Sequence, residues 1–240
     1  MVPLLAAGGV GAWKFAMYGQ MEVITASMLT NNVPRGDPGP RVIQLQGGTK
    51  ELYYYPKSTV QVTVVGEEVN KGLIDQAAIQ AAIPAVAKQQ SPANLGFAAD
   101  SSVDAVVSLG AMAGMSETQR NAFVAEALRV LKPGCPLVFI ERLPGGMPLR
   151  YLGGSSKTIS ESVFRGWEQR PDGAFSLVRW DTALEGQDPH AVGLALKADD
   201  YRGPAAASRR ADKAAEKAAE KAAEKEAKRE KARLPKKGFE

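Results

Sequence analysis

Residues 126–142, EALRVLKPGCPLVFIER, decide the fold class, because they predict a helix end, a turn and a buried strand in immediate succession. The preceding residues 117–131 form an amphipathic pattern whose apolar positions on one side are Phe123, Ala127, Val130 and Leu131. Residues 132–134 (KPG) end that helix, since proline and glycine interrupt regular structure. Residues 137–140 (LVFI) are a short apolar run, which is typical of a strand covered on both faces.

Strand-like and helix-like segments also alternate in the residues that precede this helix-turn-strand unit. Strands are predicted at residues 41–45 (RVIQL), 60–65 (VQVTVV), 83–87 and 104–109 (DAVVSL), and a helix at residues 70–82. Strands separated by helix-length segments predict a parallel sheet with right-handed crossovers. The fold class is therefore α/β, a doubly wound and mostly parallel sheet, whose ligands sit at the carboxyl ends of the strands.

The chain divides into three regions by composition. Residues 1–40 are an amino-terminal arm with one helix, predicted at 12–29, followed by the Pro/Gly-rich loop NNVPRGDPGP. Residues 41–202 carry the α/β domain. Residues 203–240 form a low-complexity tail rich in Ala, Lys and Glu, which are strong helix formers.

Charge and residue counts exclude several classes of protein. The chain carries a net charge of +4, but residues 209–237 hold 12 Lys/Arg and six Asp/Glu, so the tail is basic and the remainder is slightly acidic. The body therefore offers no basic face for nucleic acid. One cysteine and one histidine exclude disulfides, Cys-based zinc sites and multi-His metal chemistry. We expect no metal site.

The arm begins with an apolar stretch, VPLLAAGGVGAW at residues 2–13, which is shorter than the roughly 20 apolar residues of a membrane span. We therefore expect no transmembrane helix. The stretch lacks the Arg and Ser content of a transit peptide and the cleavage pattern of a signal peptide. We expect it to pack on its own domain or on a neighbouring protein; contact with a membrane surface is the alternative.

Four stretches together resemble one known family in order and spacing. They are VIQLQGGTKELYYYP, NLGFAADSSVDAVVSLGAM, EALRVLKPGCPLVFIER and DPHAVGLALK, spread over residues 40–200. The chain resembles the class I S-adenosylmethionine-dependent methyltransferases, and within them the methyltransferase type 11 group with its methyltransferase-like relatives. The resemblance implies S-adenosylmethionine as the cofactor.

The first loop of the family, E/D-x-G-x-G-x-G, is altered in this chain. By the resemblance, Gln44 occupies the acid position, Gln46 and Lys50 replace the first and third glycines, and Gly48 retains the second, with Gly47 as an additional glycine. Glycines let a ligand approach the backbone and permit unusual dihedral angles. We therefore expect the side chains of Gln46 and Lys50 to lie where the ligand should bind.

Two further acids of the family are also altered. The acid that ends the second strand aligns with Gly66, although Glu67 follows and is a substitute, and the acid after the third strand aligns with Ser91. Each lost charged acceptor costs about 1.5–3 kcal/mol. The resemblance thus implies a cofactor site formed by Gln44, Gly47, Gly48, Glu67 and Ser91, with weak or absent binding of S-adenosylmethionine and no identifiable catalytic residue.

Other polar residues have structural interpretations. We expect Tyr53, Tyr54 and Tyr55 to pack between the first helix and the sheet, with hydroxyls near the rim. Asp100 and Asp104 fit a turn that leads into a strand. His190, before the last strand, is expected to make a structural hydrogen bond, with a general-base role as the alternative. Cys135 follows a turn and is expected to be inert.

These features favour a methyltransferase-like protein that has lost most of its catalysis and serves as an accessory or structural subunit of a larger assembly. Protein partners would contact the arm and the tail, because such segments often order on binding. Likeness to plant and algal members suggests a plastid, otherwise a mitochondrion or the cytoplasm. The alternatives are an active methyltransferase on a small lipophilic or thiol substrate, and an RNA-associated or membrane-surface protein held by the basic tail.

Overall fold

The computed structural model describes residues 3–46, 48–146, 157–170, 172–201 and 203, with side chains from residue 16 onward. The strands of this part are β1 (Arg41–Gln46), β2 (Gln61–Gly66), β3 (Ala85–Gln89), β4 (Ala105–Leu109), β5 (Pro136–Arg142), β6 (Phe175–Ala183) and β7 (His190–Lys197). The helices are α1 (Pro3–Asn32), α2 (Lys71–Ala81), α3 (Glu117–Val130) and α4 (Glu161–Glu168), with 3₁₀ turns η1 (Lys50–Tyr54) and η2 (Met112–Gly114).

The described strands form one sheet in the order β3-β2-β1-β4-β5-β7-β6. Strands β1 to β5 are parallel to one another, and β7 runs antiparallel to both β5 and β6. The carboxyl ends of β1 to β5 therefore meet at one edge, which we call the carboxyl edge. The chain moves outward in opposite directions from β1 and from β4, so the switch point where such sheets bind ligands lies between these two strands.

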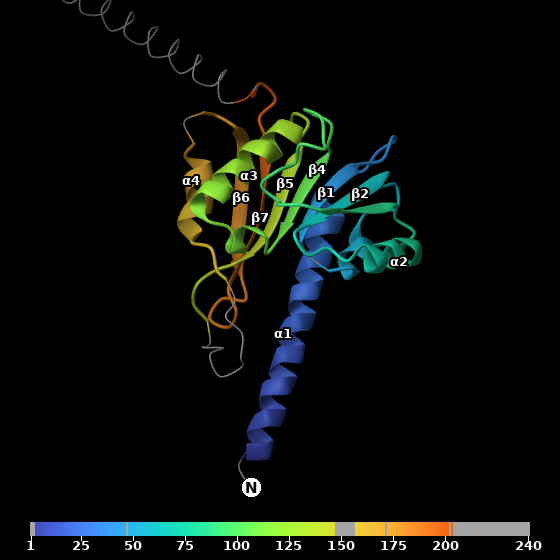
Figure 1. Ribbon diagram of the computed structural model, residues 1–240. Coiled ribbons are helices and arrows are strands. Elements are labelled where there is room, and N and C mark those ends of the chain that lie inside the picture. The colour runs from blue at the N-terminus through green and yellow to red at the C-terminus, as the bar shows by residue number, and fades with distance from the viewer. Residues whose placement is uncertain (1–2, 47, 147–156, 171, 202, 204–240) are drawn as a thin grey trace, which may run out of the picture.

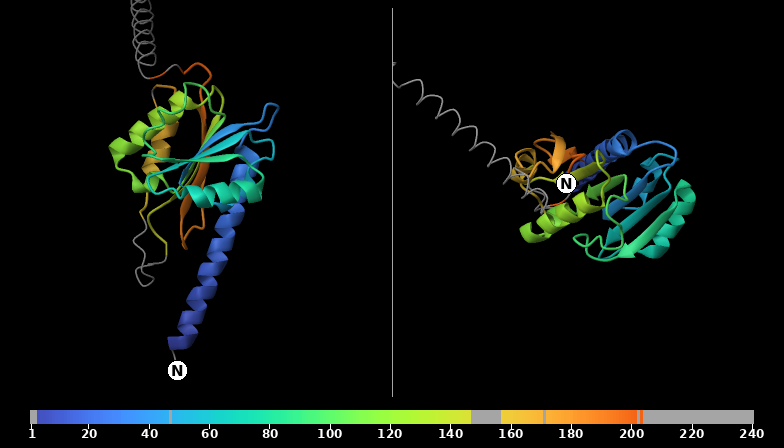
Figure 2. Two further views of the ribbon diagram at one scale, coloured as in Figure 1. Left: turned by 45° about the vertical axis from the view of Figure 1, so that its right-hand side comes forward. Right: turned by 90° about the horizontal axis from the view of Figure 1, so that it is seen from above.

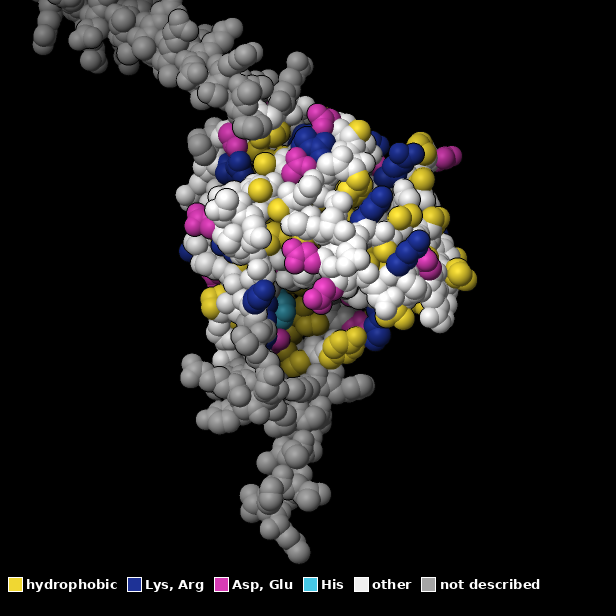
Figure 3. Space-filling model, in the orientation of Figure 1, with side chains coloured by type: hydrophobic (Ala, Val, Ile, Leu, Met, Phe, Trp, Pro, Cys, Tyr) yellow, Lys and Arg dark blue, Asp and Glu magenta, His cyan; other side chains and the backbone are white. Residues whose placement is uncertain are grey.

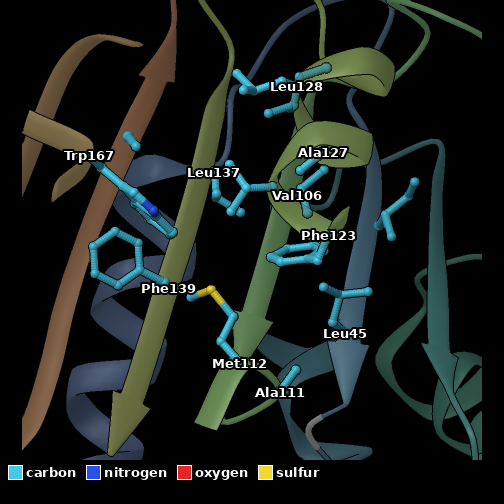
Figure 4. Close-up of a cluster of buried hydrophobic side chains, with 14 of the residues drawn as sticks. Leu45, Val106, Ala111, Met112, Phe123, Ala127, Leu128, Leu137, Phe139 and Trp167 are labelled. Carbon is cyan, nitrogen blue, oxygen red and sulfur yellow. The ribbon is translucent and has the colours of Figure 1, made fainter. Parts of the chain in front are cut away.

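One face of the sheet is covered by α3 and α4 (Figure 1). Its core is aromatic: the rings of Phe139 and Phe164 stack with centroids 4.6 Å apart, and Trp167 meets both edge-on. Figure 4 shows Phe123 of α3 pointing toward the sheet beside Val106 and Leu45. The helix predicted from residue 117 is thereby confirmed, and Ser116 and Gln119 cap it reciprocally.

The opposite face is covered by the last turns of α1, by η1 and by α2. Leu29 and Val33 are buried there with Leu52 and Tyr55 against β1, β2 and β4. The carboxyl-terminal part of α1 therefore belongs to the core of the domain.

The amino-terminal half of α1 extends well past the carboxyl edge (Figures 1 and 2). A helix of 30 residues rises about 45 Å, whereas a six-residue strand such as β1 spans about 20 Å. No helix among the described residues is long and apolar enough to cross a membrane.

Several predicted boundaries are corrected. The first helix covers Pro3–Asn32 instead of 12–29, because glycines weaken a helix by about 1 kcal/mol each without preventing it. The third strand begins at Ala85 rather than residue 83, since Ala82 takes a left-handed conformation that ends α2 and residues 83–84 serve as the connection. Helix α4 and strand β6 were not predicted. The predicted helical tail lies outside the described residues, apart from Gly203.

Candidate functional site

A hollow of about 630 Å³ opens at the carboxyl edge above β1 and β2, beside the first turn of α2. It is lined by Gln46, Gly48, Thr49, Val64, Gly66, Glu67, Glu68, Val69, Asn70, Leu73 and Ile74. The volume is within the usual range for small-molecule sites, roughly 300–1,000 Å³. We call this the β1–β2 hollow. It brings together two of the five predicted cofactor-binding residues, Gly48 and Glu67, with the altered family positions Gln46 and Gly66.

The loop after β1 keeps a glycine-like backbone at a residue that is not glycine. Gln46 has φ of 53°, a left-handed conformation that side chains with a Cβ rarely adopt. Its side chain is exposed and it lines the β1–β2 hollow, as predicted. The backbone path of a glycine loop is therefore retained while a side chain occupies its mouth.

Gln44 lies beneath this loop, fully buried. Its Nε2 donates to the carbonyl oxygens of Gln46 (3.0 Å) and Gly48 (3.5 Å), and its Oε1 accepts from the Tyr55 hydroxyl (2.8 Å). A carboxylate at this position could accept hydrogen bonds but could not donate to carbonyls. Gln44 thus fixes the loop from below and is not among the residues that line the hollow. Gly47, also predicted for the site, lies outside the described residues.

The connection from β1 to β2 contains a single 3₁₀ turn. Crossovers between parallel strands are usually made by an α-helix, whose free N–H groups at the amino end bind anions. Here the described residues 48–60 contain only η1, whose N-cap Thr49 makes no side-chain capping bond. The described part of this crossover therefore offers no helix N-terminus to a ligand.

The three tyrosines at the end of η1 connect it to three different elements. Tyr54 and Tyr55 pack in the core between α1 and the sheet, as expected, whereas Tyr53 is exposed and the Tyr55 hydroxyl is buried and not near the rim. Tyr53 donates to Gln80 of α2, Tyr54 to Glu22 of α1 and Tyr55 to Gln44 of β1. Desolvation by burial, followed by the Glu22 hydrogen bond, raises the pKa of Tyr54 to about 12.

Lys50 does not lie in the hollow, contrary to the expectation from its alignment. Its ammonium lies 3.9 Å from Glu22 and 4.9 Å from the centre of the Tyr18 ring, both on α1. The hydrogen bond to Tyr18 and the charge of Glu22 raise the pKa of Lys50. Because α1 packs beside η1, it draws this side chain away from the hollow.

The end of β2 supplies the acidic part of the hollow. Gly66 is buried, and a Cβ built there would lie 2.9 Å from Cγ2 of Val69. Glu67 and Glu68 follow and are exposed. Asn70 then caps α2 by accepting from the N–H of Leu73 at 3.1 Å. The hollow therefore has two carboxylates at its rim that are unpaired among the described residues, together with apolar side chains in its lining.

Ser91 follows β3 and is not among the residues that line the hollow. Its hydroxyl accepts from the N–H of Ala93 at 3.4 Å, which is a local turn contact. The loop beyond it is held against α3, since Glu126 accepts from the N–H of Leu95 and Arg129 donates to the Leu95 carbonyl. The structure therefore assigns Ser91 a turn contact and brings no second predicted site residue to it.

Glu141 was not predicted and is the main polar residue on the other half of the carboxyl edge. This fully buried carboxylate at the end of β5 accepts from the Ser108 hydroxyl (2.6 Å) and from the N–H groups of Met112 (3.2 Å) and Ala113 (3.0 Å). Desolvation raises its pKa. It fixes the turn η2 after β4. An acid within an otherwise apolar strand, VFIER, was the signal in the sequence.

The remaining polar candidates have structural roles. Asp104 and Asp100 make long-range contacts instead of the expected local turn contacts: Asp104 accepts from the N–H of Arg41 and pairs with Lys132, and Asp100 pairs with Arg129. Nδ1 of His190 donates to the carbonyl of Asp188 at 2.7 Å. Figure 3 shows this histidine near the lower margin of the visible face, next to hydrophobic side chains. Burial raises the pKa of the Cys135 thiol, which disfavours the reactive thiolate.

No group of His, Cys, Asp and Glu among the described residues is arranged to hold a metal ion.

Comparison with known proteins agrees with this architecture. Residues 46–139 match the profile of the family described as "Methyltransferase domain". No curated protein sequence is significantly similar to the chain.

Solved structures of similar fold include the [4+2]-cyclase SpnF (TM-score 0.57, 16% identity, 74% of this chain and 80% of that one). The S-adenosylmethionine-dependent methyltransferase SibL has a TM-score of 0.54 at 13% identity, over 82% of this chain and 60% of SibL. The N-methyltransferase NodS from Bradyrhizobium japonicum has a TM-score of 0.54 at 12% identity, over 75% of this chain and 96% of NodS.

These structural likenesses concern the fold, which supports a cyclase as well as methyltransferases and so does not fix the reaction. The sheet order, the position of the hollow and the profile match agree on one assignment. Residues 46–139 match the methyltransferase-domain family, and the fold of the chain is the one found in solved S-adenosylmethionine-dependent methyltransferases.

Proposed function

We propose that this protein is a methyltransferase-like protein with a degenerate cofactor site, and that it acts as an accessory subunit of a larger assembly. The degenerate site is supported mainly by the conformation of Gln46. This residue adopts a left-handed backbone conformation that favours glycine, and its side chain lines the mouth of the β1–β2 hollow. S-adenosylmethionine, when bound to such a fold, supplies a methyl group on a sulfonium ion.

The residues of the site fit one end of this cofactor and not the other. At the β2 end, Glu67 and Glu68 offer acceptors for hydroxyl groups. At the β1 end, the side-chain amide of Gln44 is already hydrogen-bonded to a loop carbonyl and to the Tyr55 hydroxyl. The turn η1 offers no α-helix N-terminus that could bind the carboxylate of the cofactor. Losing two charged or helix-terminal contacts, at about 1.5–3 kcal/mol each, weakens binding by two to four orders of magnitude.

Titration calorimetry with S-adenosylmethionine tests this half of the proposal. We expect dissociation constants far above the micromolar range for the natural sequence. Gln46→Gly should strengthen binding, because it removes a side chain from the mouth without changing the backbone conformation. Lys50→Ala is the matched control and should change nothing, since Lys50 points to α1. Micromolar binding by the unaltered protein would refute the loss of affinity.

The accessory role is supported by the long projection of α1. The helix continues past the carboxyl edge, and residues 2–13 contain no charged side chain in the sequence. Apolar surface left in water costs roughly 25 cal/mol per Å², so such a segment favours a protein partner. The basic tail, by its charge, is a second contact to protein, RNA or acidic lipid.

Deletion of residues 1–15 tests the role in an assembly. It stops before Met17, which is buried. In native cell extracts, the full chain should elute with a larger complex, and the deletion should elute as a monomer while keeping its melting temperature. Gln46→Ala should stay in the complex. We propose the plastid as the compartment, which cell fractionation checks; equal elution of both forms would contradict the role.

An active enzyme on a small lipophilic or thiol substrate is the second candidate. The observation in its favour is that the carboxyl edge keeps a hollow of ligand size and an ordered turn after β4 held by Glu141. Methyl transfer to small thiols, abolished by filling the hollow with Gly48→Trp, would establish this candidate in place of the first.

A further inference from the structure

We propose that a second hollow, between α3 and α4, binds a zwitterionic amino acid with a large apolar side chain. We call it the α3–α4 hollow. Its volume is about 620 Å³, and it shares no lining residue with the β1–β2 hollow. Volumes of this size are usual for small-molecule sites, roughly 300–1,000 Å³. The site is therefore separate from the one considered for the cofactor.

Two helix faces form the walls of the α3–α4 hollow. On α3, three- and four-residue spacing brings to one face the lining residues Glu117, Arg120, Asn121 and Val124. On and just after α4, the same spacing brings to the hollow Val163, Gly166, Trp167 and Arg170. A ligand held there is contacted from both helices.

The hollow presents one positive and one negative side chain without a partner charge among the described residues. The Arg120 guanidinium donates through Nη1 to the Met115 carbonyl (2.6 Å), which holds it in place and leaves its other N–H groups available. Glu117 is exposed, and within the described part of the chain its carboxylate makes no hydrogen bond or ion pair. Arg170 differs, because the Asp172 carboxylate accepts from its Nε (3.1 Å) and its Nη2 (2.6 Å).

These two charges select a ligand that carries both signs. A simple anion would face the Glu117 carboxylate, and a simple cation would face the Arg120 guanidinium. The two side chains lie three residues apart on α3, where they could meet, yet no ion pair joins them. An α-amino acid supplies a carboxylate for the guanidinium and an ammonium for the glutamate, so it satisfies both charges at once.

Open space over Gly166 gives room for the side chain of such a ligand. A Cβ built on Gly166 would meet no heavy atom within 4 Å beyond its chain neighbours and the backbone of its own helix. Glycine weakens a helix relative to alanine, so α4 by itself gains nothing from it. Around it, Val124 and Trp167 are buried and Val163 is half-buried. An aliphatic or aromatic side chain placed against them leaves water, which favours binding.

Calorimetric titration of the full chain with four probes tests the proposal: L-phenylalanine, phenylalaninamide, N-acetylphenylalanine and glycine. L-Phenylalanine should bind. The amide lacks the carboxylate and the N-acetyl compound lacks the ammonium, so each should bind at least about tenfold more weakly, the effect of losing one hydrogen bond to a charged group. Glycine keeps both charges but has no side chain, so its binding should be undetectable.

Single substitutions assign each end of the ligand. Arg120→Gln should remove the preference for phenylalanine over its amide, and Glu117→Gln the preference over the N-acetyl compound. Gly166→Leu should abolish binding by filling the open space, without lowering the melting temperature, because leucine favours a helix more than glycine does. Arg165→Gln is the matched control: this exposed arginine of α4 pairs with Glu161 and does not line the hollow, so binding should be unchanged.

Absence of phenylalanine binding to the natural chain would overturn the proposal, as would equal binding of all four probes. Undiminished binding after Gly166→Leu would place the amino acid elsewhere and overturn it as well. None of these results bears on the affinity for S-adenosylmethionine, which is assigned to the β1–β2 hollow, so the two proposals can fail independently.

Discussion

The two halves of the carboxyl edge differ in how well their residues are packed and hydrogen-bonded. On the β4–β5 side, the buried Glu141 has three donors, the aromatic rings of Phe139, Phe164 and Trp167 interlock, and α3 carries a reciprocal cap. On the β1–β2 side, a glutamine adopts a glycine conformation, a 3₁₀ turn replaces a helix and Leu73 is exposed. The first half holds the fold together, and the second half is where a ligand would bind. The β4–β5 side is therefore more fully packed and hydrogen-bonded than the β1–β2 side.

The largest expected difference between the halves is in stability. Phe164→Ala removes a fully buried ring from the aromatic cluster and should lower the free energy of unfolding by about 3–5 kcal/mol. Phe97→Ala is the matched substitution on the β3 side, where the ring is 38% exposed, and should cost much less. Urea unfolding measures both. Equal losses would show that the two halves are equally well packed.

The pH dependence of stability should trace to Glu141. Desolvation raises its pKa in the folded protein, so between the unfolded and folded pKa values the folded state binds more protons. The contribution of this group is complete below its unfolded pKa, and it is lost as the pH rises through the folded pKa. Relative to Glu141→Gln, the natural protein should therefore lose stability as the pH rises above the ordinary glutamate pKa of about 4.3. A constant difference above this pH would contradict the raised pKa.

A substitution in the β1 loop should raise the free energy of unfolding, whereas substitutions in the core lower it. Gln46→Gly relieves a left-handed conformation and should raise the free energy of unfolding by about 1 kcal/mol at most, since the gain is offset by the chain entropy of glycine. Gln44→Glu should lower it, because a carboxylate cannot donate to the Gln46 and Gly48 carbonyls. Thermal unfolding checks both signs. A destabilising Gln46→Gly would mean that the glutamine side chain holds the loop.

The smallest effect is expected at the rim of the hollow. Glu67→Gln with Glu68→Gln should change the free energy of unfolding by no more than about 0.5 kcal/mol, because both side chains are exposed and unpaired in the described part of the chain. Denaturant unfolding beside the ligand titrations would separate a binding role from a structural one. A loss as large as that of a buried substitution would show that these carboxylates support the fold.

Patterns of local origin were predictable from the sequence. The helix at 117, its end at Lys132-Pro133-Gly134 and the apolar strand after it depend on spacing, proline and glycine, and they are confirmed. The segment after β1 was harder, because Lys50 aligns with a glycine of the family but its position depends on Tyr18 and Glu22, about 30 residues earlier. Strand β6 was missed since its exposed pattern gives no apolar alternation.

The sequence by itself determined the α/β class and the order of its strands and helices, which follow from hydrophobic period and turn residues. The altered acids and glycines of the first loop are a prediction from the family resemblance. Only the tertiary structure decided what each altered residue does: Gln46 lines the hollow, Gln44 supports the loop from below, Lys50 turns to α1 and Ser91 stays in its own turn. Those outcomes depend on contacts between distant segments, and the helix α1 that packs beside η1 sets several of them.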